Sequence, residues 1–489
     1  MKLYLKKFDV SAGRPVIFLH IKTTLENNIS VGDRVEISFH DKKIIGVVDI
    51  VEDFLKKNEI ALSEDIELYL KAKEGDLISI SLIPLPASAS LIAKKRDNKE
   101  LSKEEIFSII KGIVDNRLNE VELAQFVVAV YRNGMTAKET IYLTEAIFKT
   151  GAVLNWNHKL VADKHSIGGI AGNRTTPIVV SICASAGIIM PKTSSRAITS
   201  ASGTADVMET ITKVDFPAET LKKIVQKTGA CLAWGGSLGL APADDKLIRV
   251  ERILNIDPEA QLLASILSKK LAVGSTHVLI DIPYGKYAKV SKEKGEHLKR
   301  KFISIGKHFK LKVEVVLTDG SQPIGNGIGP VLEMIDVLRV LKRDSPPIDL
   351  ETKSVFLSGK ILEMAGKAKK GLGEKMALEI LNSKLALKKF EEIISAQGKK
   401  NEKLIPADKS LNIRSSHSGT IKEIDNKSIN HIASVLGCTT DKRAGIYLHH
   451  HNKEKISRGD ILMTLYAQSS EKLKEASKLV KYRNPFLVK

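Results

Sequence analysis

The sequence predicts a multidomain protein of mixed α/β and α+β class. A chain of 489 residues is long enough for about two to four domains with hydrophobic cores. Apolar residues alternate in several short runs within residues 1–84, which predicts a small β-rich N-terminal domain. Short apolar strands alternate with helices over residues 163–240 and 277–400, and this alternation is typical of an α/β sheet.

The N-terminal domain contains a recognisable hairpin. Val35, Ile37 and Phe39 alternate with polar residues, and residues 40–43 form a plausible turn into the apolar run at 44–48. A further apolar run at 77–82 closes the segment. We expect these strands to form a small barrel-like module.

Helices are predicted for residues 101–150. Ser102 and Glu105 have the spacing of a capping box, and a second helix is expected near residues 120–131. Thr136 and Glu139 predict the start of a third helix, which should end at Gly151.

The remaining segments indicate a sheet, a linker and a smaller final domain. Residues 278–282 and 313–317 have the composition of buried strands. The polar stretch 397–409 is a candidate linker, and residues 410–489 predict an α+β domain with strands near 418–424 and 461–466.

Composition and charge narrow the possible functions. The formal net charge of +19 raises the possibility of nucleic-acid binding, but the basic residues are spread along the chain and aromatic residues make up only 5%. We therefore expect no nucleic-acid partner, and we expect the positive field to attract phosphate and anionic nucleotides instead.

The expected location is the cytoplasm. No apolar run approaches the roughly 20 residues of a membrane span, and the N-terminus lacks the apolar region of a signal peptide. The three cysteines lie far apart, which fits a reducing compartment and no metal site. We expect neither a membrane partner nor a bound metal.

Residues 192–209 are rich in hydroxyl side chains. Within residues 194–204, the hydroxyl side chains surround one cation, Arg196, and one glycine, Gly203; they belong to Ser194, Ser195, Thr199, Ser200, Ser202 and Thr204. Hydroxyls donate hydrogen bonds to oxyanions, Arg binds oxyanions through a planar fork, and Gly permits close backbone approach. The segment predicts an anion site, most simply for phosphate, and a polar surface loop is the alternative.

A second segment, residues 163–176, strengthens this interpretation. It contains Lys164 and three glycines, and it leads into an apolar stretch that has the pattern of a helix. A glycine-rich entry to a helix N-terminus favours anion binding because it offers amide donors and a positive dipole end. The spacing matches neither a Walker A motif nor a dinucleotide fingerprint.

Both segments resemble the thymidine/pyrimidine-nucleoside phosphorylase family. The match to Lys-His-Ser-x-Gly-Gly and to Ser-x-Arg-x-Ile-Thr-x-x-x-Gly-Thr-x-Asp-x-x-Glu is specific. The similarity continues at residues 234–236, 240–245, 264–270 and 444–449, so it covers nearly the whole chain. The chain is most similar to the long-form branch with an N-terminal extension, which includes the archaeal AMP phosphorylases.

The resemblance implies a domain plan. A helical lobe (residues 95–160 plus 245–275) and an α/β phosphate-binding lobe (residues 161–244 plus 276–400) would flank a cleft. The β-rich N-terminal domain would span residues 1–84 and the C-terminal α+β domain residues 410–489. In such long-form enzymes the extra domain supports oligomer assembly, so a homodimer or larger homo-oligomer is expected.

The resemblance also implies the reaction. Inorganic phosphate would attack the N-glycosidic bond of a nucleoside 5′-monophosphate, AMP first, and no cofactor would be needed. Thymidine phosphorylase activity is the alternative. Anthranilate phosphoribosyltransferase is a more remote one, because its Mg²⁺ would need acidic ligands such as Asp244 and Asp245, whereas the Lys-His-Ser loop indicates free phosphate.

The family motifs assign roles to individual residues. The implied catalytic residues are Asp257, as the acid that protonates a purine leaving group, and His165. The implied phosphate-binding residues are Lys164, Ser166, Thr175, Ser195 and Thr204. The implied nucleotide-binding residues are Gly169, Ser195, Arg196, Ala197, Ile198, Thr199, Ser200, Thr204, Ser265, Lys269 and Lys289.

Several of these residues have a structural alternative. Arg196 could instead pair with Asp206 or Glu209, and His165 could be a satisfied core histidine. Asp257 precedes Pro258, which suits a helix N-cap. Ser265 and Lys269 share one helix face, but a surface location would also explain Lys269.

One position favours AMP over pyrimidine nucleosides. Short-form pyrimidine phosphorylases place an Arg seven residues before the Asp that matches Asp257. The corresponding position here is Val250, flanked by Arg249 and Glu251. The residue that reads the pyrimidine carbonyl is therefore absent in this register.

Overall fold

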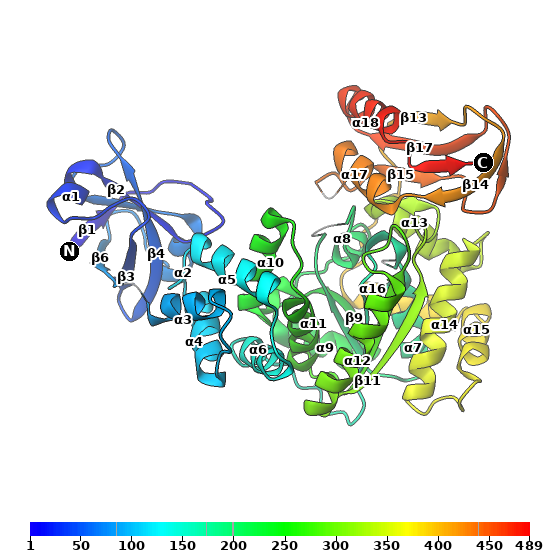
Figure 1. The fold of residues 1–489 in the computed structure, drawn as a ribbon, viewed down its shortest axis with the longest axis horizontal. Helices are drawn as coiled ribbons and strands as arrows, with labels where there is room; N and C mark the ends of the chain where they lie inside the picture. Colours follow the sequence, from blue (N-terminus) through cyan, green and yellow to red (C-terminus); the bar gives the residue numbers. More distant parts are fainter. Residues whose placement is uncertain (85, 173, 198–199, 439) are drawn as a thin grey trace. The chain divides into compact units, whose positions relative to one another are not determined.

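The computed structural model describes residues 1–489 apart from 85, 173, 198–199 and 439 (Figure 1). The chain forms two compact units. The first contains Met1–Thr150 and Ala241–Ser265, and the second contains Gly151–Leu240 and Ile266–Lys489. None of the helices in the described residues is long and apolar enough to cross a membrane.

The first unit begins with a closed barrel, which confirms the β-rich prediction. Its strand order is β1-β5-β2-β4-β3-β6. The strands are β1 (Lys2–Leu5), β2 (Val16–His20), β3 (Arg34–Phe39), β4 (Lys42–Val51), β5 (Glu59–Leu62) and β6 (Leu77–Leu82), and two short helices, α1 (Ile21–Glu26) and α2 (Glu64–Leu70), connect them. The predicted hairpin joins β3 to β4 with Phe39 opposite Lys42, and its alternating residues Val35 and Ile37 are fully buried.

The rest of the first unit is helical. It contains α3 (Ala87–Arg96), α4 (Lys103–Val114), α5 (Glu120–Asn133), α6 (Ala137–Lys149), α10 (Pro242–Leu254) and the first half of α11 (Glu259–Ala272). Both predicted capping boxes are present, at Ser102 and at Thr136. The third helix ends at Lys149 with Thr150 as its C-cap, so Gly151 is the first residue beyond the cap, where a glycine is expected to end a helix. Gly151 also allows a close approach, because a Cβ there would clash with the carbonyl of Leu240.

Parallel strands form the centre of the second unit. One sheet has the order β11-β10-β7, and β8 pairs with β9 beside it. The strands are β7 (Ala162–Ser166), β8 (Met190–Ser194), β9 (Ala230–Trp234), β10 (His277–Tyr284) and β11 (Lys312–Asp319). Strands β10 and β11 contain the predicted segments 278–282 and 313–317, although β11 is only partly buried.

Helices cover these sheets in the second unit (Figure 1). They are α7 (Thr175–Ser185), α8 (Thr204–Met208), α9 (Ala218–Thr228), α12 (Lys292–His308), α13 (Pro330–Lys342), α14 (Ile348–Met364), α15 (Gly373–Asn382) and α16 (Leu385–Ala396), with 3-10 turns at η1 (Gly169–Ala171) and η2 (Gly236–Leu238). Helix α7 is almost entirely buried in the main core.

The C-terminal part forms two small antiparallel sheets. Their orders are β12-β15-β17-β13 and β16-β14-β18. The strands are β12 (Gly327–Ile328), β13 (Lys409–Arg414), β14 (Gly419–Ile424), β15 (Gly445–Leu448), β16 (Lys455–Ile456), β17 (Ile461–Ala467) and β18 (Phe486–Val488), with α17 (Asn426–Leu436) and α18 (Ser470–Tyr482). Strand β12 comes from the segment before α13, so the α/β part of the unit completes one of these sheets.

The predicted linker at 397–409 was wrong at its first and last residues, and Lys409 begins β13. Gln397 is 2% exposed, and its side-chain oxygen accepts a hydrogen bond from the Leu232 amide at 2.8 Å. Its side-chain nitrogen donates to the carbonyl of Lys213 at 2.9 Å. Gln397 therefore belongs to the core of the second unit, because its amide satisfies backbone groups on β9 and near α8.

Candidate phosphate and nucleotide site

Strand β7 carries the first predicted anion-binding segment. It pairs in parallel with β10, with Ser166 opposite Asp281. At its carboxyl end the chain passes through the glycine-rich loop and enters α7. Ligands of open α/β sheets bind beyond the carboxyl ends of the strands, so the position of this loop suits a binding site.

The Lys164 side chain lies at the N-terminus of α7. It is 1% exposed, and its Nζ donates to Thr175 Oγ1 at 2.6 Å and to Thr176 Oγ1 at 3.4 Å. Burial lowers the pKa of Lys164 to about 7; Asp281 opposes this decrease and Lys353 adds to it. Two of the predicted phosphate-binding residues, Lys164 and Thr175, are thus in direct contact where the helix dipole favours an anion.

Ser166 is oriented by a buried carboxylate that the sequence analysis missed. Ser166 Oγ donates to Asp281 Oδ2 at 2.8 Å, and Thr318 Oγ1 donates to Asp281 Oδ1 at 2.5 Å. The Lys353 ammonium lies 3.3 Å from the same carboxylate and donates to the carbonyl of Ala171 at 2.9 Å. The sequence signal for this carboxylate is Asp281 itself, because it is an aspartate within an otherwise apolar strand.

The glycines of this loop leave little space for side chains. A Cβ at Gly172 would clash with Ser166 Oγ, and one at Gly168 would clash with the ring of Pro283. Gly169, a predicted nucleotide contact, is exposed and has a φ of +55°, in the left-handed region that favours glycine. The loop therefore depends on glycine for both packing and backbone conformation.

The second segment connects β8 to α8. The Asp206 side chain links two parts of this segment, because Asp206 Oδ2 accepts hydrogen bonds from the backbone amides of Ala197 at 2.7 Å and Gly203 at 2.9 Å. Ser195 is exposed, whereas Thr204 is buried at the start of α8. Ser200 Oγ donates to the carbonyl of Ser202 at 2.8 Å. The predicted contacts Ile198 and Thr199 lie outside the described residues.

Arg196 forms an ion pair with Glu209, which was the expected alternative to a role in ligand binding. Its guanidinium donates to both carboxylate oxygens of Glu209, at 2.6 and 2.9 Å, and lies 3.4 Å from Asp206. It also lies 4.9 Å from the ring centre of Trp234. The hydrogen bonds from Arg196 are the main cause that lowers the pKa of Glu209 to about 2. A nucleotide contact by Arg196 stays a prediction.

His165 is half-buried on β7. Burial lowers its pKa well below the ordinary value, and the positive charges of Lys270 and Lys192 add to this decrease. The imidazole is therefore uncharged at neutral pH. This state permits a hydrogen bond to a base but does not suit an imidazolium acid.

Next to Lys164 lies a buried charge network. The Asp163 carboxylate contacts the ammonium groups of Lys192 at 3.2 Å and Lys270 at 2.7 Å. Burial raises the pKa of Asp163, but the two lysines outweigh it and hold that pKa below its ordinary value. Burial also lowers the pKa of Lys270. Two cations against one carboxylate make this part of the unit positive.

The remaining predicted residues are more scattered. Asp257 is exposed in the loop between α10 and α11, in the first unit. Ser265, on α11, donates to Asp244 Oδ2 at 2.8 Å. Lys269 is half-buried on the same helix, and Lys289 is exposed after β10, both in the second unit.

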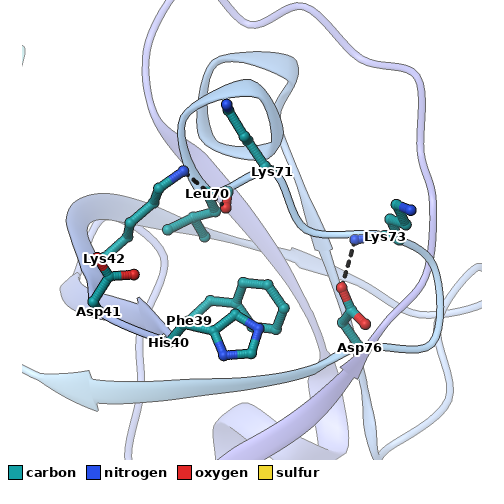
Figure 2. A pocket seen from close by; sticks show the side chains of 8 residues that line it. All are labelled: Phe39, His40, Asp41, Lys42, Leu70, Lys71, Lys73 and Asp76. Carbon is teal, nitrogen blue, oxygen red and sulfur yellow. Dashed lines mark hydrogen bonds between the residues drawn. The ribbon is translucent and has the colours of Figure 1, made fainter.

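A cavity of about 340 Å³ lies on the barrel of the first unit (Figure 2). It is lined by Phe39, His40, Asp41, Lys42, Leu70, Lys71, Lys73 and Asp76. Lys42 donates to the carbonyl of Leu70 at 3.3 Å, and the Lys73 amide donates to Asp76 at 2.7 Å (Figure 2). It contains none of the predicted site residues.

Three family models match along the chain. The glycosyl transferase family helical bundle domain matches residues 89–151, and the glycosyl transferase family a/b domain matches residues 158–334. The pyrimidine nucleoside phosphorylase C-terminal domain matches residues 420–485. Together with the two hydroxyl- and glycine-rich loops, they define a glycosyl transferase of the nucleoside phosphorylase class.

Relatives specify the branch. The AMP phosphorylase of Pyrococcus furiosus is 42% identical over 493 aligned residues, which cover 100% of this chain and 98% of the relative. That of Methanocaldococcus jannaschii is 43% identical over 93% of this chain and 92% of the relative. The chain belongs to the AMP phosphorylase family.

A solved structure confirms the fold class. The crystal structure of anthranilate phosphoribosyltransferase from Thermus thermophilus superposes with a TM-score of 0.53 and 18% identity. The superposition covers 63% of this chain and 99% of the Thermus thermophilus chain. At this identity the likeness concerns the fold alone.

Proposed function

We propose that this chain catalyses the phosphorolysis of AMP. An oxygen of inorganic phosphate forms a bond to C1′ of the ribose while the bond from C1′ to the base nitrogen breaks. The products are adenine and ribose 1,5-bisphosphate, and in the net reaction the proton of phosphate ends on adenine. Full-length relatives named AMP phosphorylases support this assignment.

The contact between Lys164 and Thr175 is the structural observation that carries the proposal. A buried lysine, Lys164, meets the hydroxyl of Thr175 at the N-terminus of α7. This arrangement combines an ammonium group that is protonated below about pH 7, a hydroxyl donor and a helix dipole in one place, which favours phosphate. We assign phosphate binding to this pair, with contributions from Ser166, Ser195 and Thr204.

Nucleotide binding is assigned to the second loop and to four residues outside it. The proposed contacts are Gly169, Ser195, Arg196, Ala197, Ile198, Thr199, Ser200, Thr204, Ser265, Lys269 and Lys289. Asp257 is proposed as the acid that protonates the leaving adenine, and its exposed loop position keeps it accessible to a ligand. His165 would hydrogen-bond the base as a neutral imidazole.

The residues of α10 at the position of the pyrimidine reader favour a purine base in the substrate over a pyrimidine. Val250 is buried in the helical core, and the adjacent Arg249 donates to the carbonyl oxygen of Gly13. The arginine nearest the expected position of the pyrimidine reader is therefore engaged with the barrel. This observation favours AMP over thymidine.

The wider proposals follow from the family. We propose that inorganic phosphate is the co-substrate and that no further cofactor takes part. We also propose a cytoplasmic homodimer or larger homo-oligomer, in which the barrel supports assembly.

A substrate panel tests the assignment. Phosphate-dependent release of free base is measured from AMP, CMP, UMP, thymidine, uridine and adenosine. Adenine released from AMP but not from adenosine is the expected result. Thymine released from thymidine, with AMP inert, would replace the proposed substrate and keep the reaction type.

A further inference from the structure

Arg174 is the largest of the fully buried side chains in the described residues, and it lies at the N-cap of α7. Its guanidinium donates to the carbonyl oxygens of Ile170 at 2.9 Å and Ile324 at 2.7 Å. It also contacts the Glu333 carboxylate at 3.3 Å. One side chain thus joins the glycine-rich loop to the segment before β12 and to α13.

Glu333 extends this connection to the second loop. Both Arg174 and Glu333 have side chains with no solvent exposure. Glu333 Oε1 also accepts hydrogen bonds from Ser202 Oγ and from the amide of Gly329, the latter at 3.1 Å. Ser202 lies two residues before Thr204, so the two hydroxyl- and glycine-rich loops meet through a single carboxylate.

We infer that Arg174, Glu333 and Ser202 form a buried clamp that positions the two loops relative to each other for phosphate binding. None of the three is assigned a phosphate contact, so they act as positioning residues. The inference rests on the proposed function of the same site and adds the residues that set its geometry.

The chemistry of the contacts explains why arginine stands at this position. A planar guanidinium can direct separate N–H groups at two carbonyls and a carboxylate, whereas a lysine ammonium is a single point charge. Removal of either partner would leave a buried charge unpaired, and a loop would have to shift to solvate it. Such a shift would change the position of Thr175, which follows Arg174 directly, relative to Ser202 and the second loop.

The test measures the affinity for inorganic phosphate by calorimetry, which requires no turnover. We expect Arg174→Ala to weaken phosphate binding at least tenfold and guanidinium ion to restore most of the loss. Methylammonium at the same ionic strength should not restore it. If Arg174→Ala does not fold, Arg174→Lys and Ser202→Ala serve instead, with an expected weakening of at least threefold.

A matched control separates positioning from general stability. Glu139→Gln weakens the buried Lys95–Glu139 ion pair (2.8 Å) in the helical part of the first unit. It should lower the melting temperature but leave phosphate affinity unchanged. The inference is overturned if the Arg174 and Ser202 variants bind phosphate within twofold of the parent, or if the parent binds no phosphate. Phosphate binding without adenine release from AMP would contradict the proposed function alone.

Discussion

At the scale of residues, the charge state of Lys164 governs the proposed phosphate site. Replacing Lys164 by Ala removes an ammonium group that contacts the hydroxyls at the start of α7. We expect kcat/KM for phosphate to fall by about 10²–10³-fold, the range seen when a preorganised group that stabilises charge is lost. The measurement is initial-rate kinetics with phosphate varied at saturating AMP.

A surface lysine supplies the control for this variant. Lys222 pairs with Glu219 on α9, and neither residue is among the proposed site residues. Lys222→Ala should retain parental kinetics. Unchanged turnover in Lys164→Ala would refute the assignment of Lys164 to phosphate.

The lowered pKa of Lys164 predicts a pH dependence. An anion binds the protonated amine, and the pKa of about 7 belongs to the protein without ligand. Above this value the protonated fraction falls about tenfold for each pH unit, so anion affinity should fall with rising pH and stay level at lower pH. Sulfate is a suitable probe because it does not titrate in this range.

The dissociation constant of sulfate is measured between about pH 6 and about pH 9, a span that brackets this pKa. Lys164→Met should bind sulfate weakly and with little dependence on pH. A parental affinity that is flat across this range would contradict the predicted charge state.

A contact in the site could be predicted from the sequence only where its two residues lie close together along the chain. Lys164 and Thr175 are eleven residues apart and belong to one local motif, so their contact is accessible to sequence reasoning. Asp281 lies 115 residues from Ser166, and Glu333 lies 159 residues from Arg174. Only the folded sheet and helices bring these carboxylates to the loops, which is why the sequence analysis missed them.

At the scale of elements, the entry to α7 depends on a glycine. A methyl group at Gly172 would clash with Ser166 Oγ and push it away from Asp281. Because overpacking typically costs about 1–3 kcal/mol, we expect Gly172→Ala to raise the KM for phosphate about tenfold.

Gly295 provides a comparison with a milder effect. A Cβ at this position on α12 would meet Leu317 at 3.2 Å, where the flexible tip of the side chain can move. Gly295→Ala should therefore keep the parental KM for phosphate. Equal KM values for the two variants would mean that the loop tolerates the displacement of Ser166.

Elements with local signals were predicted well. The capping boxes at Ser102 and Thr136 begin helices where expected, because the reciprocal hydrogen bonds involve residues only three apart. A third box at Asn119 and Glu122 begins α5. The start of the linker was harder to place, because the burial of Gln397 depends on backbone partners on β9 and near α8 that are distant in sequence.

At the scale of the whole molecule, the net charge of +19 predicts an effect on substrate capture. AMP and phosphate are both anions, and a positive field increases their encounter rate. We expect kcat/KM for AMP to fall several-fold between about 20 mM and about 200 mM salt, as screening shortens the range of the field. Sucrose at equal osmolarity should have no such effect, and a flat salt dependence would exclude a role for the field.

The products identify the reaction that the whole chain performs, and ³¹P NMR detects them when the enzyme acts on AMP and inorganic phosphate. We predict that phosphate is consumed in step with adenine release and that ribose 1,5-bisphosphate appears with two distinct phosphate ester signals. Formation of ribose 5-phosphate without consumption of phosphate, or no release of adenine, would rule out AMP phosphorolysis.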